Sequence, residues 1–218
     1  MSEHLHIVCL DSPSPPDYGG AIDMYYKFKA LHSIGKKITL HYFKYAVGRT
    51  ADNLAPYCYE VYAYKRKKGL AGLSFTLPYI VSSRINQQLI DRLNEDDDPI
   101  ILEGIHCTGI IRYIKNKGRK IVVRIHNNEA VYYKQLAKVE KNKAKQLYYK
   151  IESFLLNKYQ KSLPPNCTYA CLSTADVATF TEKYKKPASI FIPCFVAWDK
   201  LEIKQDIGIF CLYHGNMT

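Results

Sequence analysis

Apolar runs alternate with amphipathic segments along most of the chain. The apolar runs are short and rich in β-branched and aromatic residues, as strands buried on both faces of a sheet are. The segments between them have helical spacing, and this alternation is typical of βαβ units. We therefore expect an α/β fold, with a mostly parallel sheet that carries helices on both faces. The predicted strands are His6–Leu10, Ile38–Phe43, Glu60–Tyr64, Ile100–Leu102, Ile121–Ile125, Thr168–Leu172 and Ile190–Ile192.

One amphipathic segment, Ala130–Lys161, is unusually long. As an unbroken helix it would extend about 48 Å, whereas a domain of this size has a radius of gyration of about 17 Å. A kink, a break or a protrusion is therefore expected in its polar centre, Glu140–Lys145 (EKNKAK). The other predicted helices are Ala21–Gly35, Pro78–Leu93, Thr108–Lys117 and Ala175–Tyr184.

Composition narrows the class of protein. A hydrophobic content of 47% excludes a disordered chain. No apolar run approaches the roughly 20 residues of a membrane-spanning helix. The start of the chain, MSEHLHIVCL, has neither a basic lead nor a small-residue cleavage site, so we expect a cytoplasmic protein. The net charge of +11 suits an anionic substrate or an anionic membrane surface, and the absence of nucleic-acid-binding motifs argues against nucleic acid.

The cysteine pattern points to reduced thiols. The chain has seven cysteines, an odd number, and no CxxC pair. Most of them lie inside apolar runs, namely Cys9, Cys171, Cys194 and Cys211. We therefore expect buried, reduced cysteines without disulfides, and no spacing supports a bound metal.

The segment Pro13–Gly20 (PSPPDYGG) joins the first predicted strand to the first predicted helix. Gly19 and Gly20 leave backbone N–H groups uncovered at the helix start, where the helix dipole favours an anion. The same glycine pair is compatible with a tight turn that needs a positive φ. The loop therefore indicates either a phosphate-facing site or a plain turn.

Chemically active side chains follow two predicted strands. Glu103 and His106 (in IILEGIH) lie at the carboxyl end of one strand, where ligands bind in open α/β sheets. Arg124, His126 and Asn127 (in VVRIHNNE) crowd the end of the next, and a histidine there can act as acid, base or hydrogen-bond donor. Arg124 needs a carboxylate or a ligand anion as partner, and Glu103 is a candidate. The alternative is structural: an ion pair between Arg124 and Glu103, with Asn127 and His106 as helix caps.

Much of the basic charge lies in two places, Lys65–Lys68 and eight lysines between Lys134 and Lys161. Tyrosines such as Tyr132 and Tyr148 are interleaved with the second group, as at a membrane interface. A solvated helix face explains the same pattern. Both interpretations remain open.

The chain resembles the N-terminal domain of GT-B glycosyltransferases of the family-four class. The resemblance implies a Rossmann-like domain that binds the acceptor, as one half of a GT-B fold whose other half binds the nucleotide-sugar donor. It rests on the first strand with PSPPDYGG and its helix, and on IILEGIH, RIHNNEAVYYKQLA, CLSTADVATF, IFIPCFV and FCLYHGNMT.

The resemblance also implies roles for individual residues. Gly19 and Gly20 would approach the donor diphosphate, His126 would lie near the reacting sugar, and His106 would be a second cleft residue. The implied reaction is a retaining, metal-independent transfer without a cofactor. Its substrates would be a nucleotide-sugar and a glycan or lipid-linked acceptor of cell-envelope polysaccharide synthesis, handled in the cytoplasm or at the inner face of the membrane.

The resemblance divides the chain into a domain at 1–197, a linker at 198–206 and the first strand of a second domain at 207–218. The donor-binding residues of the family belong to that second domain, so we expect no sugar transfer by this chain alone. The final strand, Ile207–Tyr213, would favour strand-swapped dimers. Ile192–Phe195 keeps only the proline of the family's Pro-Asn-Gly pattern.

Two alternatives to a transferase half remain. One is a stand-alone, non-catalytic binding module of flavodoxin-like shape for phosphorylated ligands. The other is a phosphate-handling enzyme that uses His126 and Arg124.

Overall fold

The computed structural model describes residues 3–44 and 49–198. Within them seven strands form one sheet in the order β3-β2-β1-β4-β5-β6-β7, and every neighbouring pair is parallel. The predicted α/β fold is confirmed, and each predicted strand is present within two residues of its expected ends. The strands are β1 (His4–Cys9), β2 (Lys37–Lys44), β3 (Glu60–Lys65), β4 (Ile100–Glu103), β5 (Ile121–Ile125), β6 (Thr168–Cys171) and β7 (Ser189–Phe191).

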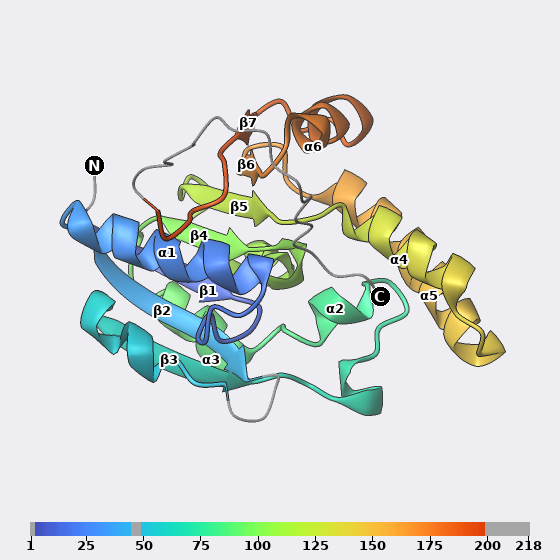
Figure 1. The fold of residues 1–218 in the computed structure, drawn as a ribbon, viewed down its shortest axis with the longest axis horizontal. Helices are drawn as coiled ribbons and strands as arrows, with labels where there is room; N and C mark the ends of the chain where they lie inside the picture. Colours follow the sequence, from blue (N-terminus) through green and yellow to red (C-terminus); the bar gives the residue numbers. More distant parts are fainter. Residues whose placement is uncertain (1–2, 45–48, 199–218) are drawn as a thin grey trace, which may run out of the picture.

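The strand order is Rossmann-like. The chain proceeds outward from β1 to β2 and β3, and then crosses back to place β4 on the other side of β1 (Figure 1). The order therefore reverses between β1 and β4. In open α/β sheets, a reversal of this kind leaves a crevice at the carboxyl ends of the strands, where ligands bind.

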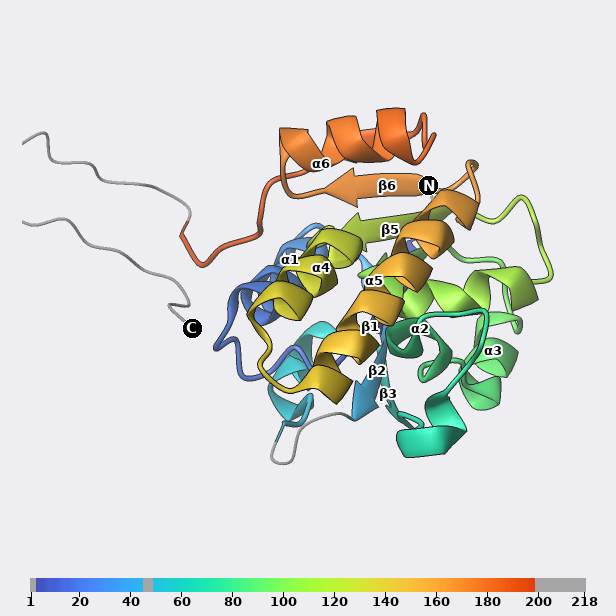
Figure 2. The same cartoon turned by 90° about the vertical axis from the view of Figure 1, so that its right-hand side faces the viewer.

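Alternation along the strands sorts the apolar side chains into two cores, one on each face. Ile7 and Cys9 of β1 pack with Met24 and Phe28 of α1 (Gly19–Ser33) on the first face. On the second face, Val8 belongs to a larger core that includes side chains from the helices after β3. Figure 2 shows α1 on one side of the strands and α2 and α3 on the other. The expectation of helices on both faces is confirmed.

The helices differ from the prediction in three places. The region predicted as one helix, Pro78–Leu93, forms two, because the Asn86 side chain accepts a hydrogen bond from the Leu89 N–H and starts a new helix there. The region Thr108–Lys117 is a 3₁₀-helix that begins earlier, after Gly104 with its φ of +77°. The last predicted helix changes to a π-helical turn halfway. These elements are α2 (Tyr79–Ser82), α3 (Gln87–Leu93), η3 (Ile105–Tyr113), α6 (Thr174–Ala178) and the π-helical η4 (Thr179–Lys183); η1 (Asp52–Tyr57) and η2 (Gly69–Gly72) are further 3₁₀-helices.

The long amphipathic segment is interrupted in its polar centre, Glu140–Lys145, as predicted. It forms two helices, α4 (Glu129–Val139) and α5 (Lys143–Ser162). The side chain of Asn142 accepts hydrogen bonds from the N–H groups of Ala144 and Lys145 and so caps α5. Figures 1 and 2 show α4 and α5 side by side, extending past the ends of the strands. We call this pair the helical hairpin.

Some expectations fall outside the described residues. They include most of the predicted linker, the strand Ile207–Tyr213 with its strand-swapped dimer, and Cys211. The described cysteines are all free thiols; Cys9 and Cys171 are buried as predicted, but Cys194 is exposed. No helix within the described ranges is both long and apolar enough to cross a membrane.

Candidate functional site

Several candidate residues meet at the carboxyl ends of β1, β4 and β5, beside the reversal of strand order. Glu103 is the last residue of β4, and Arg124 is its register partner on β5. His126 follows β5, and Gly20 lies in the first turn of α1, which packs over these strands. His106 lies in the adjoining 3₁₀-helix η3. The sequence therefore placed these residues correctly at the carboxyl ends of the strands.

Beneath α1, four buried charged side chains form a network. Lys27 Nζ lies 3.0 Å from Asp23 Oδ2 and 2.7 Å from Glu103 Oε1. Arg124 donates to Asp23 through Nε at 3.1 Å and Nη2 at 2.8 Å. Asp23 and Glu103 are fully buried, so each carboxylate depends on these cations for its stability.

The expected pairing of Arg124 with Glu103 is wrong. Arg124 pairs with Asp23 and also donates to the carbonyl oxygens of Ile192 and Pro193, at 2.7 and 2.8 Å. Its guanidinium therefore holds the segment after β7 against α1. Glu103 is instead occupied by Lys27 and His126. The physical reason for this exchange of partners is that α1 crosses the ends of β4 and β5. Its Asp23 lies against Arg124, and its Lys27, one helical turn later, lies against Glu103.

Asp23 and Lys27 were not singled out from the sequence, although a signal was present. They share the face of α1 that carries the buried Ala21, Met24 and Phe28. A polar residue at such a position needs a partner in the core. Two residues of opposite charge four apart on that face predict a buried ion pair.

The same network sets the ionisation of the carboxylates. Burial alone would raise the pKa of Glu103, but the Lys27 ammonium and the hydrogen bond with His126 hold it below its ordinary value. Burial likewise opposes ionisation of Asp23, and the contacts from Arg124 and Lys27 outweigh it, so its pKa is lowered. Both side chains are therefore carboxylates at neutral pH.

His126 lies between this network and the start of α1. Its Nε2 lies 2.9 Å from Glu103 Oε2. Because a carboxylate only accepts, the N–H of the neutral ring belongs on Nε2. Its Nδ1 is buried and has no hydrogen-bond partner among the described residues. Nδ1 of the neutral ring can therefore accept a hydrogen bond from a ligand hydroxyl, and Nδ1–H of the protonated ring can donate to an anion.

Gly19 and Gly20 are the first two residues of α1 and do not belong to the loop before it. Tyr18 is the N-cap and supplies no side-chain hydrogen bond, and no acidic residue lies in the first turn. A Cβ on Gly20 would lie 3.1 Å from the Tyr18 ring and 3.9 Å from His126 Nδ1, whereas one on Gly19 would meet nothing within 4 Å. Positive φ occurs at other glycines but not at these, so the tight-turn interpretation is wrong.

Asn127 is not the helix cap that the sequence predicted. Asn128 is, since its side chain accepts from the Val131 N–H at 3.3 Å. Asn127 is exposed and hydrogen-bonds the side chain of Glu129. Glu129 is buried at the start of α4, and burial raises its pKa to about 7 despite the contact with Asn127 and the charge of Arg84.

An arginine-lined cleft adjoins the start of α1. It has a volume of about 450 Å³ and is lined by Tyr18, Arg49, Arg66, Arg84 and His106, among others. Arg49 donates to Asp17 at 2.7 Å and to the carbonyl oxygens of Ser12 and Pro15, so it also fixes the proline-rich loop. One carboxylate, Asp11, also lines the cleft and pairs with Arg49 at 3.5 Å. Three guanidinium groups against this one carboxylate suit an anionic ligand.

His106 lines this cleft. Burial lowers the pKa of its ring well below the ordinary value, and the positive charge of Arg84 acts in the same direction. Its Nδ1 is buried and has no partner within the described part of the chain. Of the three arginines, the sequence analysis noted Arg66 alone, within the basic run Lys65–Lys68. It did not bring them together, because Arg49, Arg66 and Arg84 come from separate segments without a shared motif.

Asp23, Glu103 and His126 lie close enough together to share a metal ion. Both carboxylates, however, already contact cationic groups, Arg124 and Lys27. These positive charges oppose a further cation at this point. The residues therefore suit a positioning network better than a metal centre.

Known proteins offer limited comparison. No protein-family model matches the chain. An "Uncharacterized 44.6 kDa protein in cps region" of Klebsiella pneumoniae is 30% identical over 162 residues, which cover 71% of this chain and 41% of that protein. The chain thus matches less than half of that relative's length. The crystal structure of a UGT transferase from Siraitia grosvenorii in complex with UDP is 8% identical, with a TM-score of 0.41, over 84% of this chain and 48% of that one.

Proposed function

We propose that the chain is the acceptor-side half of a glycosyltransferase that moves a sugar from a nucleotide-sugar donor to a glycan or lipid-linked acceptor in cell-envelope polysaccharide synthesis. The observation that carries the proposal is the uncapped start of α1 at Gly19–Gly20, with the unpartnered Nδ1 of His126 beside it. Backbone N–H groups at a helix start favour phosphate oxygens, and an imidazole nitrogen can bond a sugar hydroxyl. The start of α1 and His126 Nδ1 together therefore suit a ligand that carries both a phosphate and a sugar hydroxyl.

The arginine-lined cleft supplies the second element of the proposal. A donor diphosphate at the start of α1 and an acceptor in the cleft would lie next to each other, because Tyr18 borders both. Arginine favours phosphate over a neutral sugar. We therefore expect an acceptor that carries a phosphate, as a lipid-linked sugar does.

The relative in the cps region supports the polysaccharide context of this proposal. Since the chain spans 41% of that protein, the remaining length has room for a donor-binding domain. Arg124 and Asn127 are not assigned to the ligand here: Arg124 is committed to Asp23 and the segment after β7, and Asn127 contacts Glu129. The 218-residue chain is expected to bind and not to transfer.

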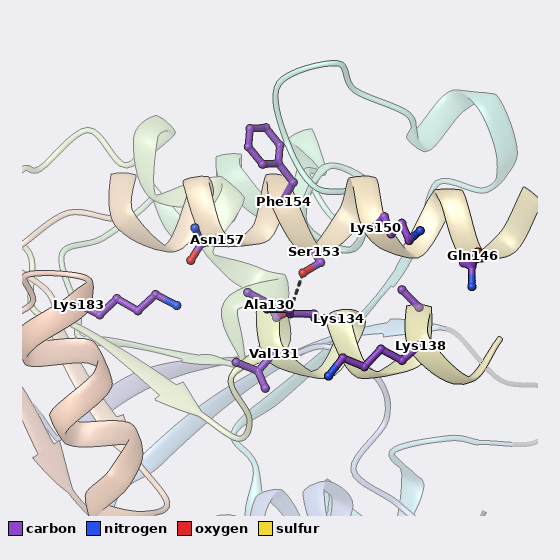
Figure 3. A pocket seen from close by; sticks show the side chains of 11 residues that line it. Ala130, Val131, Lys134, Lys138, Gln146, Lys150, Ser153, Phe154, Asn157 and Lys183 are labelled. Atoms are coloured by element: carbon purple, nitrogen blue, oxygen red, sulfur yellow. Dashed lines mark hydrogen bonds between the residues drawn. The ribbon is translucent and has the colours of Figure 1, made fainter.

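The helical hairpin is proposed to face an anionic membrane that carries the acceptor. A groove of about 670 Å³ runs between its helices, and Figure 3 shows Lys134 and Lys138 on α4 and Lys150 on α5 around it. Phe154 points away from α4 in the same view and is 68% exposed. Lysines combined with exposed aromatic side chains suit an anionic leaflet.

Pyrophosphate is a suitable probe for the proposed phosphate site. Calorimetric titration of the 218-residue chain is expected to detect binding, and Gly20→Val is expected to weaken it by about tenfold or more, since the new side chain fills the space between Tyr18 and His126. Ser33→Val is the matched control and should bind as the wild type, because Ser33 is the exposed last residue of α1, at the end of the helix away from the glycine pair. Circular dichroism confirms that both variants fold. No binding by the wild type, or equal binding by Gly20→Val, would contradict the proposal.

A stand-alone binding module for phosphorylated ligands is the second candidate, because the arginine-lined cleft lies entirely within the described residues. It makes the same prediction for pyrophosphate. The two differ in the longer protein: sugar transfer from a nucleotide-sugar by a polypeptide that contains this chain supports the transferase. Binding without transfer by that polypeptide supports the module.

A further inference from the structure

A second cluster of chemically active side chains lies at the opposite, amino-terminal edge of the sheet. His4 and His6 lie on the same face of β1, and Asp96 and Asp98 lie in the loop between α3 and β4. One ligand atom of each lies within 4.8 Å of every other. His4 Nδ1 is 2.7 Å from Asp98 Oδ2, and His6 Nε2 is 3.0 Å from Asp96 Oδ2. Parallel pairing of β1 with β4 holds the two pairs together.

The second ring nitrogen of each histidine is held from outside the cluster. His4 Nε2 lies 2.8 Å from Thr39 Oγ1, and His6 Nδ1 lies 2.9 Å from His41 Nε2. His41 Nδ1 in turn lies 2.8 Å from the hydroxyl of Tyr64. Metal-ligating histidines are oriented in this way, with one nitrogen on the metal and the other on a hydrogen-bond partner.

Metal binding through His6 Nε2 requires the neutral His6 ring to carry its proton on Nδ1. The hydrogen-bond chain through His41 and Tyr64 allows this tautomer without gaining or losing a proton. With the neutral His6 ring protonated on Nδ1, that N–H donates to His41 Nε2, and His41 Nδ1–H donates to the oxygen of Tyr64. This arrangement leaves the lone pair of His6 Nε2 directed at the carboxylates. The opposite direction of donation uses the same number of protons and returns the N–H to Nε2.

We propose that His4, His6, Asp96 and Asp98 form a binding site for a divalent metal ion of the zinc class. Four ligands of N₂O₂ type suit a tetrahedral ion, whose ligand atoms lie about 3.3 Å apart for bonds of about 2.0–2.1 Å. The observed separations, from 2.7 Å to at most 4.8 Å, bracket this value. Small shifts of these side chains therefore suffice to bring the four ligand atoms to the separations of a tetrahedral site.

The neighbouring charge selects the kind of ion. Arg119 Nη2 lies 2.7 Å from Asp96 Oδ1, which leaves Oδ2 toward His6. The guanidinium opposes a further cation, as Lys27 and Arg124 do at Asp23 and Glu103, but here its ion pair is with Oδ1 of one of the two carboxylates, and it orients that carboxylate with Oδ2 toward His6. Mg²⁺ and Ca²⁺ depend on charged oxygen ligands, whereas Zn²⁺ also gains from imidazole, so the site favours the latter.

The metal would have a structural role. It would tie the start of β1 to the loop before β4, at the edge of the sheet opposite His126 and the arginine-lined cleft. The sequence did not predict it, because the histidines and aspartates are about 90 residues apart and meet only through strand pairing. Zinc-site motifs with short spacing do not contain such a pattern.

The test is a zinc titration of the chelator-treated, reduced 218-residue chain against a chromophoric chelator. One equivalent is expected to bind, and His4→Ala combined with Asp98→Asn is expected to weaken binding by about 100-fold or more. Both residues are partly exposed, which favours folding of the variant; His32→Ala with Asp91→Asn, on two exposed surface residues, is the matched control. Zinc is also expected to raise the Tm of the wild type and not that of the double variant.

X-ray absorption of the zinc-loaded wild type keeps the proposal testable if the double variant fails to fold. Only nitrogen and oxygen ligands at about 2.0–2.1 Å, including two imidazoles, are expected. A sulfur ligand at about 2.3 Å would instead assign the metal to the cysteines and overturn the proposal. Failure of the wild type to bind zinc, or a loss of binding in His126→Ala, would also overturn it.

Discussion

Two neighbouring regions at the carboxyl ends of the strands treat charge in opposite ways. In the network beneath α1, Asp23, Lys27, Glu103 and Arg124 are buried and contact one another with short hydrogen bonds. In the arginine-lined cleft, cationic side chains border an open volume, and the buried Nδ1 of His106 has no partner in the described ranges. In the first region the charged groups balance one another, whereas in the second they border an open volume.

The difference shows where binding should be sought. A charged residue at a strand end is not by itself a ligand group, because its donors can be used within the fold, as those of Arg124 are. A buried polar atom without a partner indicates a missing water or ligand. His126 connects the network with the start of α1, because its Nε2 contacts Glu103 and its Nδ1 lies toward Gly20.

The largest expected effect comes from breaking the network. Arg124→Met removes both hydrogen bonds to the buried Asp23 and the hold on the segment after β7. Asp23 keeps Lys27 but loses its other partner, and breaking a buried ion pair by removing one partner costs about 3–5 kcal/mol, so the free energy of unfolding should fall by about that amount. Urea denaturation at pH 7 measures it.

Arg112→Met is the control for this loss, since Arg112 is an exposed arginine away from the network. Its stability should stay within about 0.5 kcal/mol of the wild type. A loss below about 1 kcal/mol for Arg124→Met would show that the network is not structural and would return Arg124 to the list of ligand-binding candidates.

The next effect concerns Glu129, whose pKa is raised to about 7 by burial. Between its ordinary pKa and this value, the folded chain keeps a proton that the unfolded chain releases. The stability from this group is therefore complete below about pH 4.5 and is lost as the pH rises through about 7. Glu129→Gln should gain about 2–3 kcal/mol relative to the wild type between pH 4.5 and pH 8, as measured by urea denaturation at several pH values.

Glu182→Gln provides the comparison for Glu129, because Glu182 is exposed. Its stability relative to the wild type should be nearly constant over the same range of pH. If Glu129→Gln behaves like Glu182→Gln, Glu129 is solvated rather than buried at the start of α4.

A smaller effect tests the arginine-lined cleft. Arg66 lines it, donates to Ser83 Oγ at 3.0 Å, and its guanidinium lies over the ring of Tyr79. Arg66→Met should weaken the binding of pyrophosphate about tenfold, as the loss of one charge-assisted hydrogen bond does. Lys67→Met is the matched control: Lys67 is the exposed neighbour and does not line the cleft, so its affinity should be unchanged. Equal losses in both variants would indicate a general charge effect instead of a site.

The sequence predicted the fold well because its strands are short apolar runs that only a parallel sheet can bury. It also placed Glu103, His106 and His126 at the correct edge, since strand ends can be read from the pattern. It failed on the pairing of Arg124, because the partner of a buried charge depends on how a helix crosses the sheet. Asp23 lies 101 residues from Arg124 in the sequence.

The arginine-lined cleft was missed for a related reason. Arg49, Arg66 and Arg84 come from separate connecting segments, and each resembles an ordinary surface charge in the sequence. Only the folded chain shows that they share a cavity. Asn127 and Asn128 show a finer limit: two adjacent asparagines are equally good caps by composition, and the backbone geometry after β5 selects the second.

The smallest expected effect tests whether the acceptor in the arginine-lined cleft is carried by a membrane. Each lysine near an anionic leaflet contributes about 1 kcal/mol, so Lys134→Gln should lower partitioning onto phosphatidylglycerol vesicles about fivefold at low salt. Lys37→Gln removes the same charge from the opposite, amino-terminal end of the sheet and should lower it much less. Sedimentation with vesicles measures both. If the two variants lose equally, the net charge of +11 is responsible rather than the helical hairpin. If the wild type does not bind at low salt, the proposed membrane role of the helical hairpin is wrong.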